Sequence, residues 1–131
     1  MASGLTTTER NRYLDTIYAT QAVYGALLTA DPGDAGAVAN EVANLYDYAR
    51  TELTCLTAAS GSIANTAALE FPVANGGAFG TVTHLMITTS NAWQGDTGIA
   101  SGSLTASKTI ADGDQIKFAI GNITIAIAAQ A

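Results

Sequence analysis

Charged residues are scarce in this chain of 131 residues. Asp, Glu, Lys and Arg together make up 12% of the sequence, about half of the share that is usual in soluble proteins. The five Lys and Arg residues form no basic cluster, and the net charge is −6. Binding to nucleic acid or to an anionic membrane needs grouped basic side chains, so the sequence argues against both partners. A surface with so few charges favours association with other proteins.

Cysteine and histidine are almost absent. Cys55 is the only cysteine, so the chain can form no internal disulfide and no thiolate metal site. The only histidine, His84, has no acid or nucleophile near it in sequence, and a hydrogen-bonded strand residue is the simpler interpretation. The N-terminus has no apolar segment of the signal-peptide type, and no apolar run approaches the ~18 residues of a membrane span. We therefore expect a soluble protein without a secretion signal, folded as one domain over 1–131.

The stretch FPVANGGAFGTVTHLMI, residues 71–87, is the part around which the chain is organised. In its second half Val82 and Met86 alternate with Leu85 and Ile87, so apolar side chains fall on both faces of a strand. A strand that is buried on both faces is usually central. The pattern therefore predicts that this strand lies in the middle of a β-sheet.

A helix is expected over residues 6–19, after a short tail over 1–5. Thr6 precedes Glu9 by three residues, which is the spacing of a capping box. Four apolar side chains follow at helical spacing and predict an amphipathic helix; they are Tyr13, Leu14, Ile17 and Tyr18. This apolar stripe packs either on the domain's own sheet or on a neighbouring subunit, and the sequence does not separate the two.

The rest of the chain, 21–131, reads as short strands separated by turn cues. Alternation or apolar runs predict strands over 22–29, 48–57, 67–71, 80–87, 104–110, 115–120 and 123–127. Residues 61–65 read as a turn, and 35–46 as a helical turn or loop. Asp112-Gly113 and Gly121-Asn122 read as hairpin turns before and after the strand at 115–120. The predicted fold class is mainly β: an antiparallel, jelly-roll-like β-sandwich with one N-terminal amphipathic helix.

Arg50 is expected to form a cross-strand ion pair with Glu52 or Glu70, on the wet face of its strand. Trp93, the only tryptophan, stands in a polar loop over 89–103 and is either packed down or presented to a partner.

No cofactor or metal site is predicted. The Gly-rich loop over 73–79 is followed by no Lys and leads into a strand. It therefore matches neither the P-loop nor the dinucleotide-binding motif, both of which lead into a helix. Two Asp pairs resemble parts of calcium loops, but carboxylates around a Pro-Gly or Asp-Gly turn usually only shape the turn; the pairs are Asp31 with Asp34 and Asp112 with Asp114. Glu52 and Glu70 are the only plausible strand carboxylates for glycoside hydrolysis, and Trp93, Tyr46 and Tyr48 could contact a sugar. We expect no enzyme activity and no small-molecule substrate.

An ordered set of segments carries a family resemblance. It comprises a leading amphipathic helix, AVYGALLTADPGDAG at 22–36, YAR at 48–50, FPVANGGAFGTVTH at 71–84 and GSLTASKTIADGDQIKFAIGNITIAI at 102–127. In this order they resemble a family of small virion proteins of tailed bacteriophages, often called tail fibre proteins and similar in some virions to capsid decoration proteins. The chain differs from the family in having Phe79 where Trp is usual, and Leu85-Met86 where a smaller pair is common.

The resemblance implies a structural virion protein. Our first expectation is a capsid decoration, or cement, subunit that binds neighbouring copies of the major capsid protein and copies of itself, with a homotrimer as the assembly that suits this role. It would be made in the host bacterial cytoplasm and would lie on the capsid exterior. The alternative is a tail fibre or tail-tip adaptor or knob that contacts the tail or a host receptor. The candidate interface residues are Tyr13, Leu14, Ile17, Tyr18, Asn75, Phe79 and Trp93.

Overall fold

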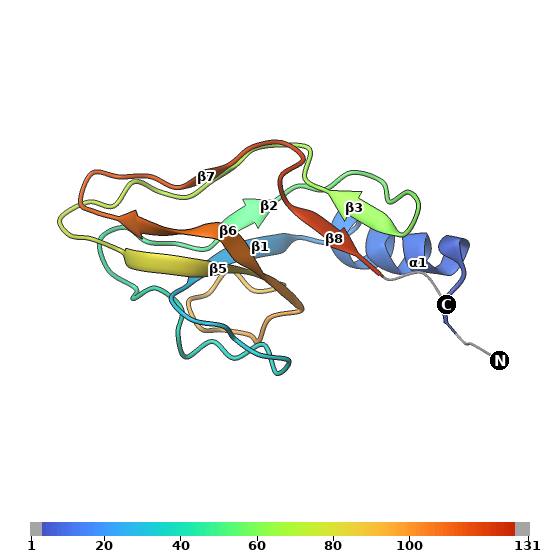
Figure 1. Cartoon of the computed structure of the whole chain (residues 1–131), viewed down its shortest axis with the longest axis horizontal. Coiled ribbons are helices and arrows are strands. Elements are labelled where there is room, and N and C mark those ends of the chain that lie inside the picture. The colour runs from blue at the N-terminus through green and yellow to red at the C-terminus, as the bar shows by residue number, and fades with distance from the viewer. Residues whose placement is uncertain (1–3, 128–131) are drawn as a thin grey trace.

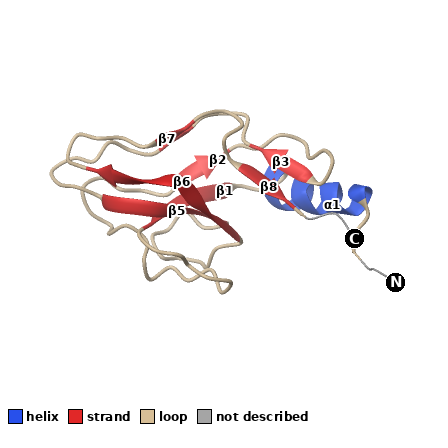
Figure 2. Cartoon of the chain, in the orientation of Figure 1, coloured by secondary structure: helices blue, strands red, loops and turns tan. Residues whose placement is uncertain are grey.

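The computed structural model describes residues 4–127, which fold as a mainly β structure with helix only near the N-terminus (Figures 1 and 2). The helical elements are α1 (Thr7–Leu14) and a π-helical turn, η1 (Asp15–Ala19). The strands are β1 (Val23–Leu28), β2 (Thr51–Leu53), β3 (Ser62–Ala64), β4 (Leu69–Glu70), β5 (Gly80–Thr88), β6 (Ala100–Ile110), β7 (Lys117–Phe118) and β8 (Thr124–Ala126). The predicted fold class is confirmed.

The largest sheet has four antiparallel strands in the order β2-β1-β5-β6. β5 therefore has a partner on each side, as the sequence predicts for 80–87. Its side chains are buried on both faces, since Val82 and Met86 are fully buried and Leu85 and Ile87 nearly so. The predicted strand over 22–29 is likewise confirmed as β1.

Two smaller sheets correct the predicted order of pairing in the C-terminal third. β7 pairs with β4, and β8 pairs with β3, so the hairpin expected at Gly121-Asn122 is wrong. Asn65 explains the difference, because its buried side chain occupies this turn. Its Oδ1 accepts from the backbone N–H of Ile123 (3.0 Å) and its Nδ2 donates to the carbonyl of Ala119 (3.1 Å). The turn is thereby fixed to Asn65, the residue after β3, and does not close a hairpin between β7 and β8.

The expected hairpin at Asp112-Gly113 is also wrong, although the turn itself forms. Asp114 donates its backbone N–H to the carbonyl of Ala111 (2.9 Å), and Gly113 has a φ of 90° that favours glycine. The chain then leaves the large sheet. β6 is already paired with β5, and the next strand, β7, pairs with β4 instead.

Three boundaries differ from the prediction. The strand expected over 48–57 is confined to β2, because the preceding residues turn through a left-handed pair, Tyr46 and Asp47 (φ 58° and 68°). The supposed turn at 61–65 contains β3, and β6 begins at Ala100 inside the expected loop over 89–103. Segment 35–46 is a loop with turns.

The helical segment begins as predicted. Thr6 accepts the backbone N–H of Glu9 at 3.3 Å, but the Glu9 carboxylate accepts from Arg12 instead of completing the capping box. Leu14 and Tyr18 lie one helical turn apart and are both buried.

The larger of two core clusters runs through the described chain, and the smaller consists of Ala26, Leu28 and Met86. The larger cluster includes side chains from the helical segment, the large sheet and the loops beyond it, among them Leu14, Tyr18, Ile63, Leu27, Val82, Phe71, Phe79, Tyr48 and Ile123. In Figure 1, α1 and the β3–β8 pair lie at one end of the long axis, and the loops that precede β5 and follow β6 lie at the other. The molecule therefore has two ends and a shared core between them.

Candidate interaction surfaces

A buried ion pair organises the loops beside the large sheet. The side chains of Glu41 and Arg50 are fully buried and meet in a bidentate contact, with Nε to Oε2 at 2.9 Å and Nη2 to Oε1 at 2.8 Å. The Tyr48 hydroxyl donates to Oε2 of Glu41 (2.7 Å) and accepts from the backbone N–H of Leu27 (3.1 Å). Burial, followed by the negative charge of Glu41, raises the pKa of Tyr48 well above its usual range.

The expected partner of Arg50 is therefore wrong. Glu52 is exposed on β2, and Glu70 pairs across β4 and β7 with Lys117 at 3.7 Å. Alternation placed Arg50 on a wet face, but Arg50 precedes β2, and its side chain turns inward to meet Glu41 from the loop over 35–46. Tyr48, expected as a possible sugar contact, is also buried.

The same ion pair holds the Trp93 loop. The backbone N–H of Gln94 donates to Oε1 of Glu41 (3.0 Å), and Arg50 donates to the carbonyl of Ser90 (3.0 Å). Trp93 donates its indole N–H to the carbonyl of Val42 (2.8 Å), yet 41% of Trp93 stays exposed. Trp93 is therefore anchored by its polar edge, as expected for a residue packed down on the loop, while much of its ring faces solvent.

The helical end presents part of the predicted apolar stripe. Leu14 and Tyr18 belong to the chain's own core, with 1% and 5% exposure. The expectation that they contact a partner at the surface is therefore wrong. Burial raises the pKa of Tyr18. Tyr13 is 56% exposed and Ile17 partly buried. Both line a shallow groove of about 420 Å³, whose walls are Leu5, Glu9, Arg12, Tyr13, Thr16 and Ile17.

Arg10 of α1 is buried although it is charged. Its guanidinium donates to the carbonyl of Ile127 (3.0 Å) and to the Thr7 hydroxyl (3.0 Å). Helix α1 is thereby tied to the residue that follows β8, so the helix surface is held firmly against the small β3–β8 sheet.

The loops at the opposite end form a second surface. Phe79 is a core residue, 7% exposed, and its ring lies edge-on to that of Tyr48 with 5.6 Å between the ring centroids. The expectation that it contacts a partner at the surface is therefore wrong. Asn75 is exposed and donates to the carbonyl of Tyr46 (3.0 Å) and to the carboxylate of Asp47 (3.2 Å). Large apolar side chains exposed in these loops are Leu45, Tyr46 and Val73.

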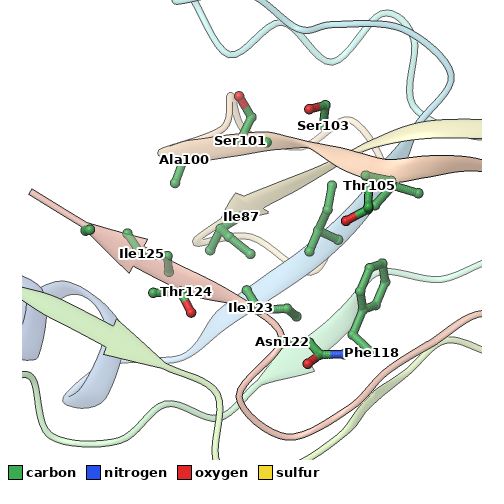
Figure 3. A pocket seen from close by; sticks show the side chains of 14 residues that line it. Ile87, Ala100, Ser101, Ser103, Thr105, Phe118, Asn122, Ile123, Thr124 and Ile125 are labelled. Atoms are coloured by element: carbon green, nitrogen blue, oxygen red, sulfur yellow. The ribbon is translucent and has the colours of Figure 1, made fainter.

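A third surface was not found from the sequence. A groove of about 750 Å³ opens between β6 and β8, with side chains of β5 at its floor (Figure 3). Its lining residues are Leu85, Ile87, Ala100, Ser101, Gly102, Ser103, Leu104, Thr105, Phe118, Asn122, Ile123, Thr124, Ile125 and Ala126. None of them is charged. The groove depends on strand pairing between distant segments, and the alternation in each strand gives no sign of it.

Within residues 4–127, no group of three His, Cys, Asp or Glu side chains is placed to hold a metal ion. His84 is half-buried, and its Nδ1 lies 2.8 Å from the hydroxyl of Thr83. Cys55 is partly buried, and burial raises the pKa of its thiol. Across the same residues, no helix has the length and apolar character needed to cross a membrane.

Comparison with known protein families gives one finding. The family model described as podophage GP4 fiber I protein gp80 matches residues 5–126, which is nearly the whole chain. A search of curated proteins found no match.

Proposed function

The chain belongs to the family described as podophage GP4 fiber I protein gp80, a family of bacteriophage structural proteins, and from that premise we propose that it is a fibre component of the virion. The family match over residues 5–126 is the observation that carries this proposal. The role is mechanical: the chain binds other virion proteins and catalyses no reaction. It takes no cofactor, small-molecule substrate, nucleic acid or membrane as a partner.

The shape of the molecule suits an adaptor or a terminal knob. These 131 residues contain no internal repeat of the kind from which a fibre shaft is built. The helical end and the loop end lie at opposite ends of the long axis (Figure 1), and each exposes apolar side chains. One end would attach to the tail and the other would face the next fibre component or a host receptor. Tyr13 and Ile17 are the contacts we propose at the helical end, and Asn75 at the loop end.

A capsid decoration role is the second candidate, and the low charge content favours it. Only 12% of residues are charged, so a subunit could cover capsid proteins with little desolvation of ions. It would bind the major capsid protein and copies of itself, as a homotrimer, on the capsid exterior. Interfaces of about 800 Å² per partner would suffice, because many copies act together.

Copy number in purified particles separates the two roles. We would quantify the chain by mass spectrometry against the major capsid protein. A handful of copies per particle supports the fibre role, whereas a ratio near one-to-one, or a simple fraction of it, supports decoration. Absence of the chain from particles would refute both.

A matched pair of variants tests the helical end. Tyr13→Ser removes an exposed aromatic ring from the candidate contact, and Ile120→Ser removes an equally exposed apolar side chain (56% and 66% exposure) from a turn outside it. We expect Tyr13→Ser to lower incorporation into particles several-fold, because aromatic side chains dominate interface energies. Ile120→Ser should leave incorporation unchanged. Equal incorporation of both variants would remove the helical end from the proposal.

A further inference from the structure

The two edges of the four-stranded sheet differ greatly. β2, at one edge, has three residues and carries an exposed carboxylate, Glu52. β6, at the other edge, has eleven residues and includes no proline, no carboxylate and a single charge, Lys108. Natural sheets usually protect their edges with short strands, charges or proline, since an open edge offers unpaired N–H and C=O groups to another strand. β2 is protected in this way and β6 is not.

An irregularity limits the open edge to one half of β6. The register with β5 shifts between Val82 and His84, so four residues, 104–107, bulge opposite Thr83. Residues 100–103 remain a regular strand, paired with 84–87. This regular half borders the groove of about 750 Å³ in Figure 3.

The groove beside this edge has an apolar lining that the chain covers only in part, because Leu104, Phe118 and Ile125 are half-buried. Ile87 of β5 lies at its floor and Ile125 comes from the opposite wall (Figure 3). Part of that wall is β8, which pairs with β3 along one edge and with no strand of the described residues along the other. The groove is therefore flanked by two strands that each have an open side. A half-exposed apolar groove bounded by open strands is typical of a protein-binding site.

The distribution of charge indicates what binds there. The chain has eleven carboxylate residues, but none lies in 97–111 or in 115–127, the segments that contain β6 and β8. These segments carry only Lys108 and Lys117. Two copies with a net charge of −6 each repel one another, and the repulsion is least where both surfaces lack carboxylates.

We propose that the open edge formed by 100–103 and the adjoining groove is a self-association surface, and that its occupant is a second copy of this chain. Pairing of this edge with the neighbour would satisfy its open backbone groups, and the neighbour's side chains would cover the half-buried Leu104 and Ile125. The inference goes beyond the proposed function, because it holds equally for a fibre and for a decoration subunit.

Gly102 provides the sharpest variant. It lines the groove, its φ lies outside the left-handed region, and a Cβ built there meets no atom within 4 Å. Gly102→Asp should therefore fold normally while placing a carboxylate in the contact, where it would lose its water. Ser107→Asp is the matched control, since Ser107 is an exposed residue in the bulged part of the same strand and does not line the groove.

Sedimentation velocity of the purified full chain measures the effect. We expect the wild type to sediment as two or three chains of 13.3 kDa, the number indicating a two-fold or a cyclic contact. Gly102→Asp should weaken association at least tenfold, and Ser107→Asp should have a much smaller effect. A wild type that stays monomeric up to about 100 µM, or equal effects of the two variants, would overturn the proposal.

Hydrogen exchange gives an independent map of the surface in the unmodified protein. On raising the concentration of the wild type, backbone amides of 100–103 should exchange more slowly, because the neighbour would accept hydrogen bonds from them. Protection that appears instead on α1 or the Trp93 loop would place self-association elsewhere and refute this surface. Circular dichroism of both variants separates a loss of fold from a loss of association.

Discussion

Arg50 shows how much a single buried charge can determine locally. Its guanidinium binds both oxygens of Glu41 and the carbonyl of Ser90, and so joins three stretches of chain that are distant in sequence. A buried ion pair adds little stability compared with an apolar pair, because both charges lose their water. Removal of one partner is different, since it leaves the other charge buried and uncompensated.

We therefore predict that Arg50→Met lowers the free energy of unfolding by about 3–5 kcal/mol. Urea titration followed by Trp93 fluorescence would measure it, since Trp93 lies on the loop that Arg50 holds. Arg12→Met is the matched control: Arg12 pairs with Glu9 on the surface, where such pairs contribute about 0–1 kcal/mol. Equal losses in the two variants would contradict the role given to the buried pair.

Tyr48 makes stability depend on alkaline pH. Burial, and then the charge of Glu41, raises the pKa of Tyr48 above its ordinary value of 10.0. Above that pH the unfolded chain releases the proton while the folded chain keeps it. The stabilisation is thus complete below pH 10 and is lost as pH rises further, by up to about 1.4 kcal/mol per pH unit.

Tyr48→Phe should therefore reduce the loss of stability between pH 10 and 11, while costing about 1–3 kcal/mol at pH 7, where Leu27 loses its hydrogen-bond acceptor. Some alkaline loss should remain, because burial also raises the pKa of Tyr18. Urea unfolding across the pH range would test this, with Tyr13→Phe as the exposed control. An unchanged pH dependence in Tyr48→Phe would be incompatible with the prediction.

At the scale of elements, the stability of helix α1 depends on Thr6, the N-cap residue that precedes it. Thr6 caps the helix through the backbone N–H of Glu9. We predict that Thr6→Ala costs about 1 kcal/mol of unfolding free energy. Thr8→Ala, two residues on and exposed, should be neutral or slightly stabilising because alanine favours helix. Urea unfolding of the pair would decide, and a Thr8→Ala loss as large as that of Thr6→Ala would argue against the cap.

The elements themselves were more predictable than their partners. Alternation of Val82, Leu85, Met86 and Ile87 reports burial on both faces, and this pattern is local, so β5 and its central place could be predicted. Pairing is not local. The side chain of Asn65 holds the turn before Ile123 from a distance of 58 residues, and no pattern near Gly121 reveals it.

The candidate surfaces follow the same rule. Tyr13 and Asn75 are exposed, which a contact with a partner requires. Leu14, Tyr18 and Phe79 were wrongly placed on the surface, since sequence does not tell an apolar side chain that packs on its own core from one that binds a neighbour. The groove between β6 and β8 was missed because it exists only once those strands lie opposite one another.

For the whole molecule, the shared core argues that both ends unfold together. Side chains from α1 and β3, such as Leu14 and Ile63, belong to the same buried cluster as Val42 and Phe79 near the loops. The smaller buried cluster, Ala26, Leu28 and Met86, lies on strands β1 and β5, which also contribute to the large cluster. A large cluster that joins distant elements in this way is typical of small domains that unfold in one cooperative step.

We predict one calorimetric transition whose van't Hoff and calorimetric enthalpies agree, near 90 kcal/mol at about 60 °C for a chain of this length. Arg50→Met acts beside the large sheet and Thr6→Ala at the helical end, so each should move this one transition to lower temperature without splitting it. Gly102→Asp is the suitable background, because dissociation of an assembly would otherwise add to the measured enthalpy. Two transitions, each sensitive to only one of the two substitutions, would show instead that the helical end and the large sheet are separate folding units.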